Sequence, residues 1–371
     1  MKNIIQHLMK TIKVLFVAVT IAILAACSGK EAKAPVYVWE GINARTDMEE
    51  LSEKFRFWKS NGVVGVCMGC DDPDVIREAS ARAHAEGLEY HAWIGAMTRG
   101  GKPHGWYTVN RLGQPSDENP PYVPYYTTLD PADPDVREYL TGMYSEIAGL
   151  PDVDYVQLDY IRYADVILSR GLWDKYGLVM DEEYAPADYC YCDDCVAEFK
   201  ELTGIDIREV EDPSKVKEWA QFRCDKVTEL VNMIVDAVHA KGKKVSADVF
   251  PGPMSHAYWM VRQEWSRWNV DMLFPMNYND FYLEGPEWLA TIVKEEVGSA
   301  PEGVPVMSGL FICPDWQNKD KVVDPENSGL LPSEMETAVR GSLDNGAAGI
   351  CLFTPGRMSQ EHWDALAKAI K

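Results

Sequence analysis

The chain has 371 residues and carries 36 Lys and Arg against 58 Asp and Glu, so its formal net charge at pH 7 is −22. An acidic surface repels phosphate backbones and anionic lipid headgroups, which argues against a nucleic-acid-binding protein. The length exceeds that of an average domain, but α/β barrels of this size form a single domain.

The N-terminal segment, residues 1–26, has the pattern of a secretory signal peptide. A few lysines precede an apolar run, residues 14–26, which is too short to span a membrane as a helix. The run ends in Leu-Ala-Ala before Cys27, which resembles the lipobox of exported bacterial lipoproteins, whose cysteine is acylated. We therefore expect cleavage before Cys27, lipidation of that cysteine and a tether over residues 27–35. The alternative is an uncleaved signal anchor with a coincidental cysteine.

This N-terminus also predicts where the protein resides. A lipid on Cys27 would anchor the chain to a membrane of the cell envelope. Ser28 directly after the cysteine permits sorting to the outer membrane. We therefore expect a lipid-anchored protein that faces the periplasm or the cell surface.

Short apolar, β-rich runs alternate with amphipathic stretches from residue 36 onward. The predicted strands are residues 36–39, 63–68, 88–94, 155–159, 244–250, 272–275, 304–310 and 348–353. The predicted helices between them include residues 47–60, 73–86, 134–148, 215–241, 285–297 and 332–345. Several helices open with a start signal such as Asp-Pro, and a glycine suited to a helix C-cap precedes several strands.

Eight strands alternating with helices indicate parallel βαβ units, and eight is the number that closes a (β/α)8 TIM barrel. We therefore expect an α/β protein whose residues 36–371 form one barrel domain, with long loops over residues 95–133 and 160–214. The alternative is an open, doubly wound sheet. Such a sheet usually has fewer strands and often a glycine-rich phosphate loop after the first, a pattern that residues 40–43 lack.

Residues at the ends of the predicted strands are acidic, amide-bearing and aromatic. In TIM barrels these ends and the loops that follow them carry the functional residues. Aromatic faces provide apolar platforms for sugar rings, while amide, Arg and Tyr side chains hydrogen-bond to hydroxyls. The candidate substrate-binding residues at these ends are Glu40, Trp93, Tyr160, Arg162, Asn277, Tyr278 and Asp280.

Asp159 and Asp248 are the candidate catalytic carboxylates. Each lies at the end of an apolar strand, where a charge is costly unless it faces the barrel mouth with partners. Glycosidic cleavage uses two carboxyl groups, so we expect Asp159 as nucleophile or transition-state stabiliser and Asp248 as general acid/base. The alternative for Asp159 is a structural carboxylate paired with Arg162, and a structural role is equally open for Asp248. No catalytic cofactor is expected.

Several segments resemble glycosyl-hydrolase-like TIM-barrel families related to family 10. The segments that carry the resemblance, in chain order, are WYTVNRLGQ (residues 106–114), LDPADPDVREYL (129–140), QLDYIRY (157–163), DMLFPMNYN (271–279) and GAAGICLF (346–353). They are similar to a Trp-containing strand, a helix entry, the FDYIRYP motif of the fourth strand, the sixth strand and the closing strand of these families. Together they cover most of the chain after the tether.

This resemblance implies a barrel that acts on glycans. It carries Asp159 over as a site residue by position, and Trp106 is a further candidate substrate-binding residue. Ala164 stands where the families usually have Pro, so the match around the fourth strand is incomplete. The resemblance does not identify the sugar, the linkage or the acid/base partner.

A cysteine cluster lies in the second long loop. Cys190, Cys192 and Cys195 are spaced so closely that three thiolates can converge on one tetrahedral ion, and Cys224 is the nearest candidate for a fourth ligand. The motif resembles a segment of family 42 β-galactosidases, whose cysteines hold a structural zinc. The resemblance therefore implies a structural zinc site.

Disulfides are the alternative interpretation of this cluster, because an envelope compartment is oxidising. A bridge between Cys190 and Cys192 would close a very tight ring, so two bridges would need partners elsewhere, such as Cys67 and Cys70. In neither interpretation does the cluster perform the catalytic chemistry.

The leading hypothesis is a glycoside hydrolase that cleaves extracellular or periplasmic glycans with a pair of carboxylates. The first alternative is a non-catalytic, surface glycan-binding lipoprotein that keeps the barrel and its aromatic rim. A carbohydrate deacetylase is a third possibility. That chemistry usually needs a His/Asp metal set, which the predicted strand ends do not contain.

Overall fold

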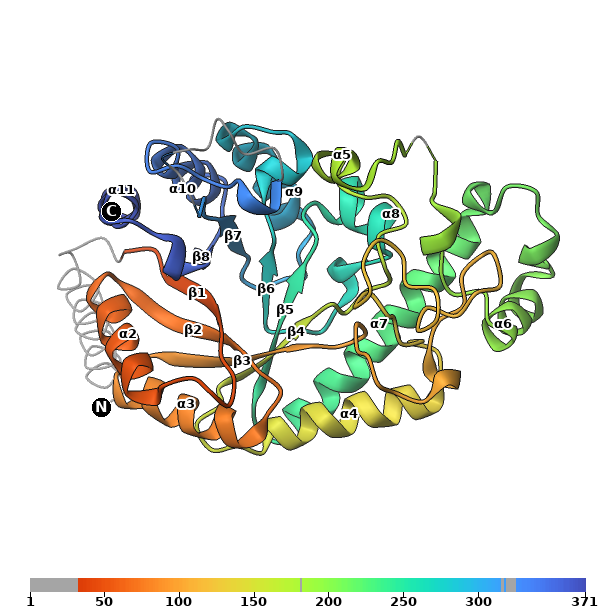
Figure 1. Ribbon diagram of the computed structural model, residues 1–371, viewed down its shortest axis with the longest axis horizontal. Coiled ribbons are helices and arrows are strands. Elements are labelled where there is room, and N and C mark those ends of the chain that lie inside the picture. Colours follow the sequence, from red (N-terminus) through yellow and green to blue (C-terminus); the bar gives the residue numbers. More distant parts are fainter. Residues whose placement is uncertain (1–32, 181, 315–316, 318–324) are drawn as a thin grey trace, which may run out of the picture. The chain divides into compact units, whose positions relative to one another are not determined.

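The computed structural model describes residues 33–180, 182–314, 317 and 325–371 (Figure 1). Cys27 and the predicted signal peptide therefore lie outside the described residues. Ala34–Ile370 form one structural unit. No helix within the described ranges combines the length and apolar character needed to cross a membrane.

Eight strands alternate with helices along this unit. The strands are β1 (Val36–Gly41), β2 (Val63–Gly69), β3 (Glu89–Gly95), β4 (Tyr155–Asp159), β5 (Lys244–Val249), β6 (Met272–Pro275), β7 (Met307–Phe311) and β8 (Gly349–Phe353). The α-helices are α2 (Met48–Ser60), α3 (Pro73–Ala85), α4 (Pro134–Ala148), α5 (Trp173–Tyr176), α6 (Asp193–Thr203), α7 (Lys217–His239), α8 (Tyr258–Val261), α9 (Leu289–Ser299), α10 (Met335–Leu343) and α11 (Gln360–Ala369).

All the strand pairs are parallel, and the sheet has the order β6-β5-β4-β3-β2-β1-β8-β7. Its two edge strands approach each other through the bridges Leu273↔Val306 and Met276↔Gly309. The amide of Asn277 donates to the carbonyl oxygen of Gly309 at 2.9 Å across the same seam. The sheet is thus a nearly closed barrel, which confirms the predicted fold and excludes the open, doubly wound alternative.

Local sequence signals explain where the first helices begin. Asp47, Asp72 and Asp133 each accept hydrogen bonds from the amides two and three residues ahead, as N-cap residues do. Proline follows Asp72 and Asp133 at the first helical position, where the missing N–H costs nothing. The predicted helix starts at residues 47, 73 and 134 therefore agree with the structure to within one residue.

Several elements differ from the sequence-based expectation, among them α9 and α10, which begin at Leu289 and Met335 rather than at residues 285 and 332. Strand β7 begins at Met307 rather than at residue 304, because Pro305 has no N–H to contribute to a ladder. Helix α11 was not predicted. It begins with a capping box in which the side chains of Ser359 and His362 each accept a hydrogen bond from the other residue's backbone amide. The third helical position of a capping box usually holds Glu or Gln, so the His at this position made the motif hard to identify from sequence.

The barrel interior is filled by large side chains that face glycines on other strands. A Cβ atom at Gly309 would lie 2.7 Å from the ring of Trp39, and one at Gly69 would lie 2.7 Å from the ring of Trp93. Large residues opposite small ones give the interdigitated interior that TIM barrels require. The strand ends near Trp93 therefore rest on a packed core.

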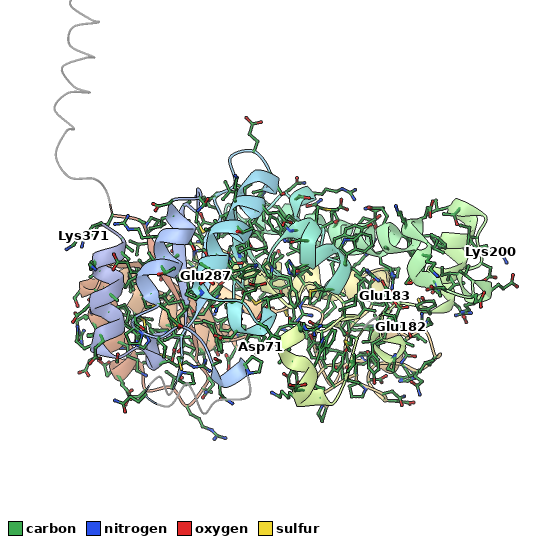
Figure 2. All side chains as sticks on the ribbon, turned by 90° about the horizontal axis from the view of Figure 1, so that it is seen from above. Asp71, Glu182, Glu183, Lys200, Glu287 and Lys371 are labelled. Atoms are coloured by element: carbon green, nitrogen blue, oxygen red, sulfur yellow. The ribbon has the colours of Figure 1, made fainter. Side chains whose placement is uncertain are left out.

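The long insertions after β3 and β4 reach beyond the helical layer. Figure 1 shows α4 and α7 lying side by side against the strands, whereas α6 belongs to the β4 insertion and lies farther out. Lys200 on α6 lies well away from Asp71, which follows β2 (Figure 2). The part of the insertion that includes α6 is thus separate from the strand ends.

Gly309→Ala should lower the free energy of unfolding by about 1–3 kcal/mol, the usual cost of overpacking a core. The reason is that the new Cβ would lie 2.6 Å from the carbonyl oxygen of Pro275 and 2.7 Å from Trp39, at the seam that closes the barrel. Urea unfolding followed by circular dichroism measures this change.

Gly142→Ala is the matched control. Gly142 lies within α4 with open space around it, so alanine should raise the free energy of unfolding by roughly 0.5–1 kcal/mol through its helix propensity. If G309A were as stable as the unaltered protein, the packing at the seam would not be as tight as described.

Candidate functional site

A cavity of about 620 Å³ opens at the carboxyl ends of the barrel strands. Aromatic side chains dominate its wall, and its charged lining residues are Asp159, Arg162, Asp165 and Arg357. We call it the main cavity. Its position is the one at which TIM-barrel enzymes bind their substrates.

Asp159, the last residue of β4, is the carboxyl group at the floor of this cavity. The indole Nε1 of Trp93 donates to its Oδ2 at 2.9 Å, and the amide of Tyr160 donates to its Oδ1 at 2.7 Å. Its side chain is almost fully buried, with 8% exposure. Burial raises the pKa of Asp159, and the two N–H donors and Arg162 only partly oppose that effect. A carboxyl group of this kind retains its proton to a higher pH than an exposed aspartate.

Tyr160 has an unusual backbone conformation that places its amide on Asp159. Its φ is 47°, in the left-handed region that a bulky residue rarely adopts. The turn lets Tyr160 leave the strand and line the cavity while its N–H faces back to the carboxylate. Strained backbone of this kind is common at functional sites.

Arg162 is held by a buried ion pair in the wall of the main cavity. Its Nη1 lies 2.9 Å from Oδ2 of Asp165, and the two side chains are 8% and 6% exposed. The hydroxyl of Tyr126 also donates to Asp165, and that of Tyr122 donates to the Asp165 backbone carbonyl at 2.6 Å. Arg162 is therefore paired with Asp165 rather than with Asp159, contrary to the structural alternative considered for Asp159.

A second cavity, of about 550 Å³, adjoins the main cavity. The two share four lining residues: Trp93, Tyr125, Asp159 and Tyr160. Asp71 lines the second cavity, where its Oδ2 lies 3.1 Å from Nη1 of Arg99. Asp159 thus lies at the junction of two cavities, with space on either side of its carboxyl group.

Stacked rings form the wall of the main cavity at the ends of the last three strands. Tyr278 lies 5.0 Å from Phe311 and 6.0 Å from Phe353, measured between ring centroids. Phe311 and Phe353 stack at 5.8 Å with an interplanar angle of 20°. Trp93 meets Phe353 edge to face at 6.2 Å. These flat faces suit the C–H surfaces of sugar rings.

The structure therefore gathers five of the predicted site residues around one cavity: Trp93, Asp159, Tyr160, Arg162 and Tyr278. They come from β3, β4 and the segments that follow β4 and β6, which the barrel brings together at one end. The remaining predicted residues lie elsewhere.

Asp248, expected at the barrel mouth, is instead turned into the barrel. Its side chain is 2% exposed, and its Oδ1 accepts a hydrogen bond of 2.7 Å from Gln157, two residues before Asp159 on β4. Burial and the nearby Asp159 charge raise the pKa of Asp248 well above its usual range. It is not among the described lining residues of either cavity, because this inward-facing side chain lies in the barrel interior against Gln157.

The other predicted substrate-binding residues have structural surroundings. Asn277 is buried and donates to Glu296 at 3.1 Å and to Ser308 at 3.0 Å. Asp280 accepts the Gly329 amide at 2.8 Å, which holds the segment that follows β7.

Trp106 and Glu40 also lie outside the two described cavity linings. Trp106, in the long loop after β3, packs against Tyr139 of α4, with the ring centroids 5.5 Å apart and the ring planes tilted by 39°. Glu40 lies near the mouth, with its carboxylate oxygens about 3.9 Å from the position a Cβ would take at Gly356. A strand-end position alone thus does not ensure contact with the cavities.

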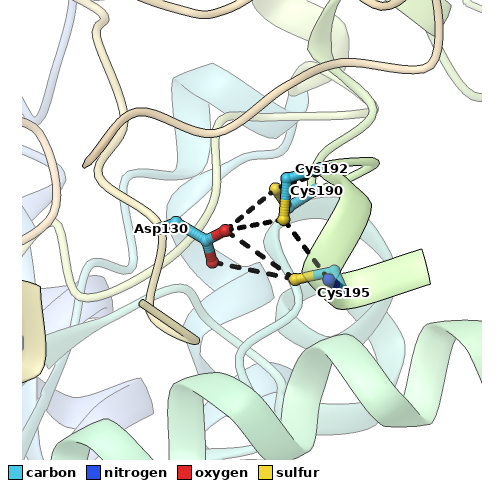
Figure 3. A group of neighbouring side chains, drawn as sticks. All are labelled: Asp130, Cys190, Cys192 and Cys195. Carbon is cyan, nitrogen blue, oxygen red and sulfur yellow. Dashed lines mark hydrogen bonds between the residues drawn. The ribbon is translucent and has the colours of Figure 1, made fainter. Parts of the chain in front are cut away.

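The cysteine cluster forms a separate group away from the mouth. Figure 3 shows the Asp130 carboxylate facing the sulfur atoms of Cys190, Cys192 and Cys195. Their ligand atoms all lie within 4.8 Å of one another, and Oδ2 of Asp130 is 3.2 Å from Cys190 Sγ and 3.1 Å from Cys192 Sγ. Burial raises the pKa of Asp130 to about 7. Three thiols and a carboxyl group suit a tetrahedral metal ion.

The sequence suggested Cys224 as the fourth member of this group. In the structure the fourth member is Asp130. Cys224 is buried on α7 against Ala220 and Tyr258. Every cysteine within the described residues is a free thiol, and Cys67 and Cys70 are not part of the group. The disulfide alternative therefore has no support in this geometry.

Sequence reasoning missed three residues that matter to these sites. Asp130 lies in the helix-entry segment 129–140, where its place between Leu129 and Pro131 is a sign of a constrained carboxylate. Asp165 and Arg357 lie several residues beyond the strand ends that were searched. Their contribution depends on loop paths, which no sequence period reveals.

No family model matches the sequence, and no curated protein matches it significantly. Solved structures do match in fold. The PgaB (BpsB) glycoside hydrolase domain from Bordetella bronchiseptica aligns over 92% of this chain and 99% of its own, with a TM-score of 0.63 and 11% identity. The β-amylase catalytic domain from Paenibacillus polymyxa aligns over 92% and 99%, with a TM-score of 0.59 and 11% identity.

A class V chitinase from Pseudomonas fluorescens Pf-5 aligns over 91% of this chain and 100% of its own, with a TM-score of 0.52 and 11% identity. At such identities the likeness concerns the fold alone. The chain has the TIM-barrel fold of these glycoside hydrolases.

Proposed function

We propose that this protein is a glycoside hydrolase-like enzyme that cleaves a glycan lying across Asp159. The observation that carries the proposal is a buried carboxyl group at the junction of two cavities, walled by aromatic rings, at the catalytic end of a TIM barrel. A glycan chain needs space on both sides of the bond to be cleaved, and the two cavities offer that space. The fold shared with glycoside hydrolases is consistent with this proposal.

In this proposal Asp159 protonates the glycosidic oxygen. A general acid must hold a proton near neutral pH, and burial beside Trp93 favours the protonated form of this group. This role differs from the nucleophile expected from sequence. It is preferred because Asp248, the expected acid, has no described contact with either cavity.

Asp71 is the proposed second carboxylate. It lines the second cavity, is 63% exposed, and its Oδ2 lies 3.1 Å from Nη1 of Arg99. A carboxylate that is open to solvent can act as a base toward water or stabilise the developing oxocarbenium ion. Asp248 then serves as a positioning residue, because its hydrogen bond from Gln157 fixes the strand layer directly below Asp159.

The sugar would be bound by stacking and hydrogen bonding. Tyr278, Phe311 and Phe353 present ring faces to the main cavity, and Tyr125, 61% exposed, borders both cavities. Tyr160 and Arg162 line the same space with polar groups that can reach hydroxyls.

Non-catalytic glycan binding is the second candidate function. The observation that favours it is that only Asp159, among the carboxylates described in the main cavity, is free of an ion pair with Arg or Lys. A single unpaired carboxyl group is sufficient for binding but not for two-carboxylate hydrolysis.

Asp159→Asn should abolish turnover of the glycan that the protein cleaves, by at least about 10²-fold, because the amide cannot supply the proton. Turnover by the unaltered protein should also fall as pH rises through the pKa of Asp159, since only the protonated group can act. A panel of oligosaccharides assayed for released reducing ends, over a range of pH, measures both effects.

Asp71→Asn should slow the same reaction, whereas Asp117→Asn, a partly buried aspartate that pairs with His104, should not. Binding of a glycan without cleavage by any of these proteins would favour the binding function. Full turnover by D159N would remove Asp159 from the mechanism.

We propose that Asp130, Cys190, Cys192 and Cys195 hold a structural zinc ion. Asp130 belongs to the loop after β3 and the cysteines to the loop after β4, so an ion would join the two loops. Both loops also supply walls of the main cavity, through Tyr126 and Asp165 respectively. The ion would thus support the site without taking part in the chemistry.

Purified protein should contain one zinc per chain, and its removal by a chelator should lower the melting temperature by roughly 5–10 °C, at about 2–4 °C per kcal/mol. Metal analysis should find no stoichiometric zinc in Cys192→Ser but unchanged zinc in Cys224→Ser, because Cys224 lies outside the group. Metal-free native protein with unaltered stability would contradict the proposal.

We also propose that the chain is a lipoprotein of the cell envelope, acylated on Cys27. The support is the signal-peptide pattern and the small residues before that cysteine. Labelled palmitate should be incorporated into the protein in a bacterial host and should be absent from Cys27→Ser. Equal labelling of both proteins, or of neither, would contradict this assignment.

A further inference from the structure

Two arginines line the main cavity, and they have different surroundings. Arg162 is neutralised by Asp165 at 2.9 Å. Arg357, on the short helix η12 (Pro355–Arg357) after β8, has no carboxylate within ion-pair distance in the described part of the chain. The charge of Arg357 is therefore not balanced by a paired carboxylate, as the charge of Arg162 is by Asp165.

The guanidinium of Arg357 is positioned by aromatic rings and one carbonyl group. Its Cζ lies 4.8 Å from the centroid of Phe311 and 5.5 Å from that of Phe353. Nη1 lies 3.4 Å from the carbonyl oxygen of Ile312, a long hydrogen bond. A guanidinium has five N–H donors, so most of the donors of Arg357 have no acceptor among the residues that the structure describes.

Burial lowers the pKa of Arg357, and Tyr278, Cys313 and, from beyond ion-pair distance, Glu40 only partly oppose that effect. A partly buried cation without a counter-charge destabilises the folded protein. A ligand that supplies a negative charge would offset that cost. The planar fork of arginine matches a carboxylate through two parallel hydrogen bonds.

We propose that Arg357 binds a carboxylate of the substrate, so that the main cavity takes an acidic glycan containing uronic acid units. This inference rests on the proposed action on glycans and adds the class of sugar. The rings of Phe311 and Phe353 that support the guanidinium also form the sugar-binding wall, so a ring stacked there would present its acidic group to Arg357.

The chain as a whole carries a net charge of −22, which repels polyanions at long range. Recognition of an acidic glycan must therefore depend on a local cation. Arg357 supplies that cation, and the ion pair of Arg162 with Asp165 keeps the other arginine neutralised.

The test compares acidic oligosaccharides with their carboxyl-reduced counterparts. Oligogalacturonate, oligoguluronate and oligomannuronate are each titrated calorimetrically into D159N protein, which binds without turnover, beside the same oligomers with the carboxyl groups reduced to alcohols. At least one acidic oligomer should bind roughly 10- to 100-fold more tightly than its reduced form, the range expected for charge-assisted hydrogen bonds.

Arg357→Gln in the same background should remove that preference, whereas Arg357→Lys should retain part of it, because it keeps the charge but loses the planar fork. Arg56→Gln is the matched control, since Arg56 lies on α2 in a surface ion pair with Glu86. Unchanged urea midpoints for the four proteins show that any loss is local.

Equal or tighter binding of every carboxyl-reduced oligomer would overturn the inference, and so would a preference for the acidic oligomer that survives R357Q. These outcomes are separable from the fate of the proposed hydrolysis. If the protein cleaves neutral glycans in an Asp159-dependent way and R357Q has no effect, the proposed hydrolysis is supported and the acidic subsite is rejected. If uronates bind in an Arg357-dependent way but the unaltered protein does not cleave them, the acidic subsite is supported and the proposed hydrolysis is rejected.

Discussion

The carboxyl group of Asp159 is held in an apolar barrel mouth by two N–H donors, and the arrangement of both cavities depends on that contact. Trp93 donates at 2.9 Å and the Tyr160 amide at 2.7 Å. A carboxyl group buried without such donors would cost several kcal/mol. Because the Trp93 ring also borders both cavities, one hydrogen bond fixes the polar group and the apolar wall together.

The rest of the molecule keeps this contact in place from below and from above. Below it, Trp93 packs over Gly69 and Gln157 binds Asp248, so the interior layers leave little room for the strand ends to shift. Above it, Tyr122 donates to the Asp165 backbone and joins the loops after β3 and β4. The Asp130 and cysteine group joins the same two loops at a second place.

The sequence was sufficient to predict the fold, because strand and helix periods and cap signals such as Asp47 are local properties. It also placed Asp159 and Trp93 together, since a parallel barrel brings all the strand ends to one rim. It did not predict the burial of Asp248, because alternation gives the face of a strand but not the depth of a side chain. The roles of Asp130 and Arg357 were not predicted for a different reason. The paths of the loops, rather than the spacing of residues in the sequence, decide what these two side chains contact.

A crystal structure of D159N protein with a bound oligosaccharide tests the central claim most directly. The account predicts sugar rings in both cavities, with a glycosidic oxygen within hydrogen-bond distance of the amide that replaces the carboxyl group, between Trp93 and Tyr160. Sugar bound only on the outer surface, or in the main cavity with no glycosidic bond near position 159, would contradict it.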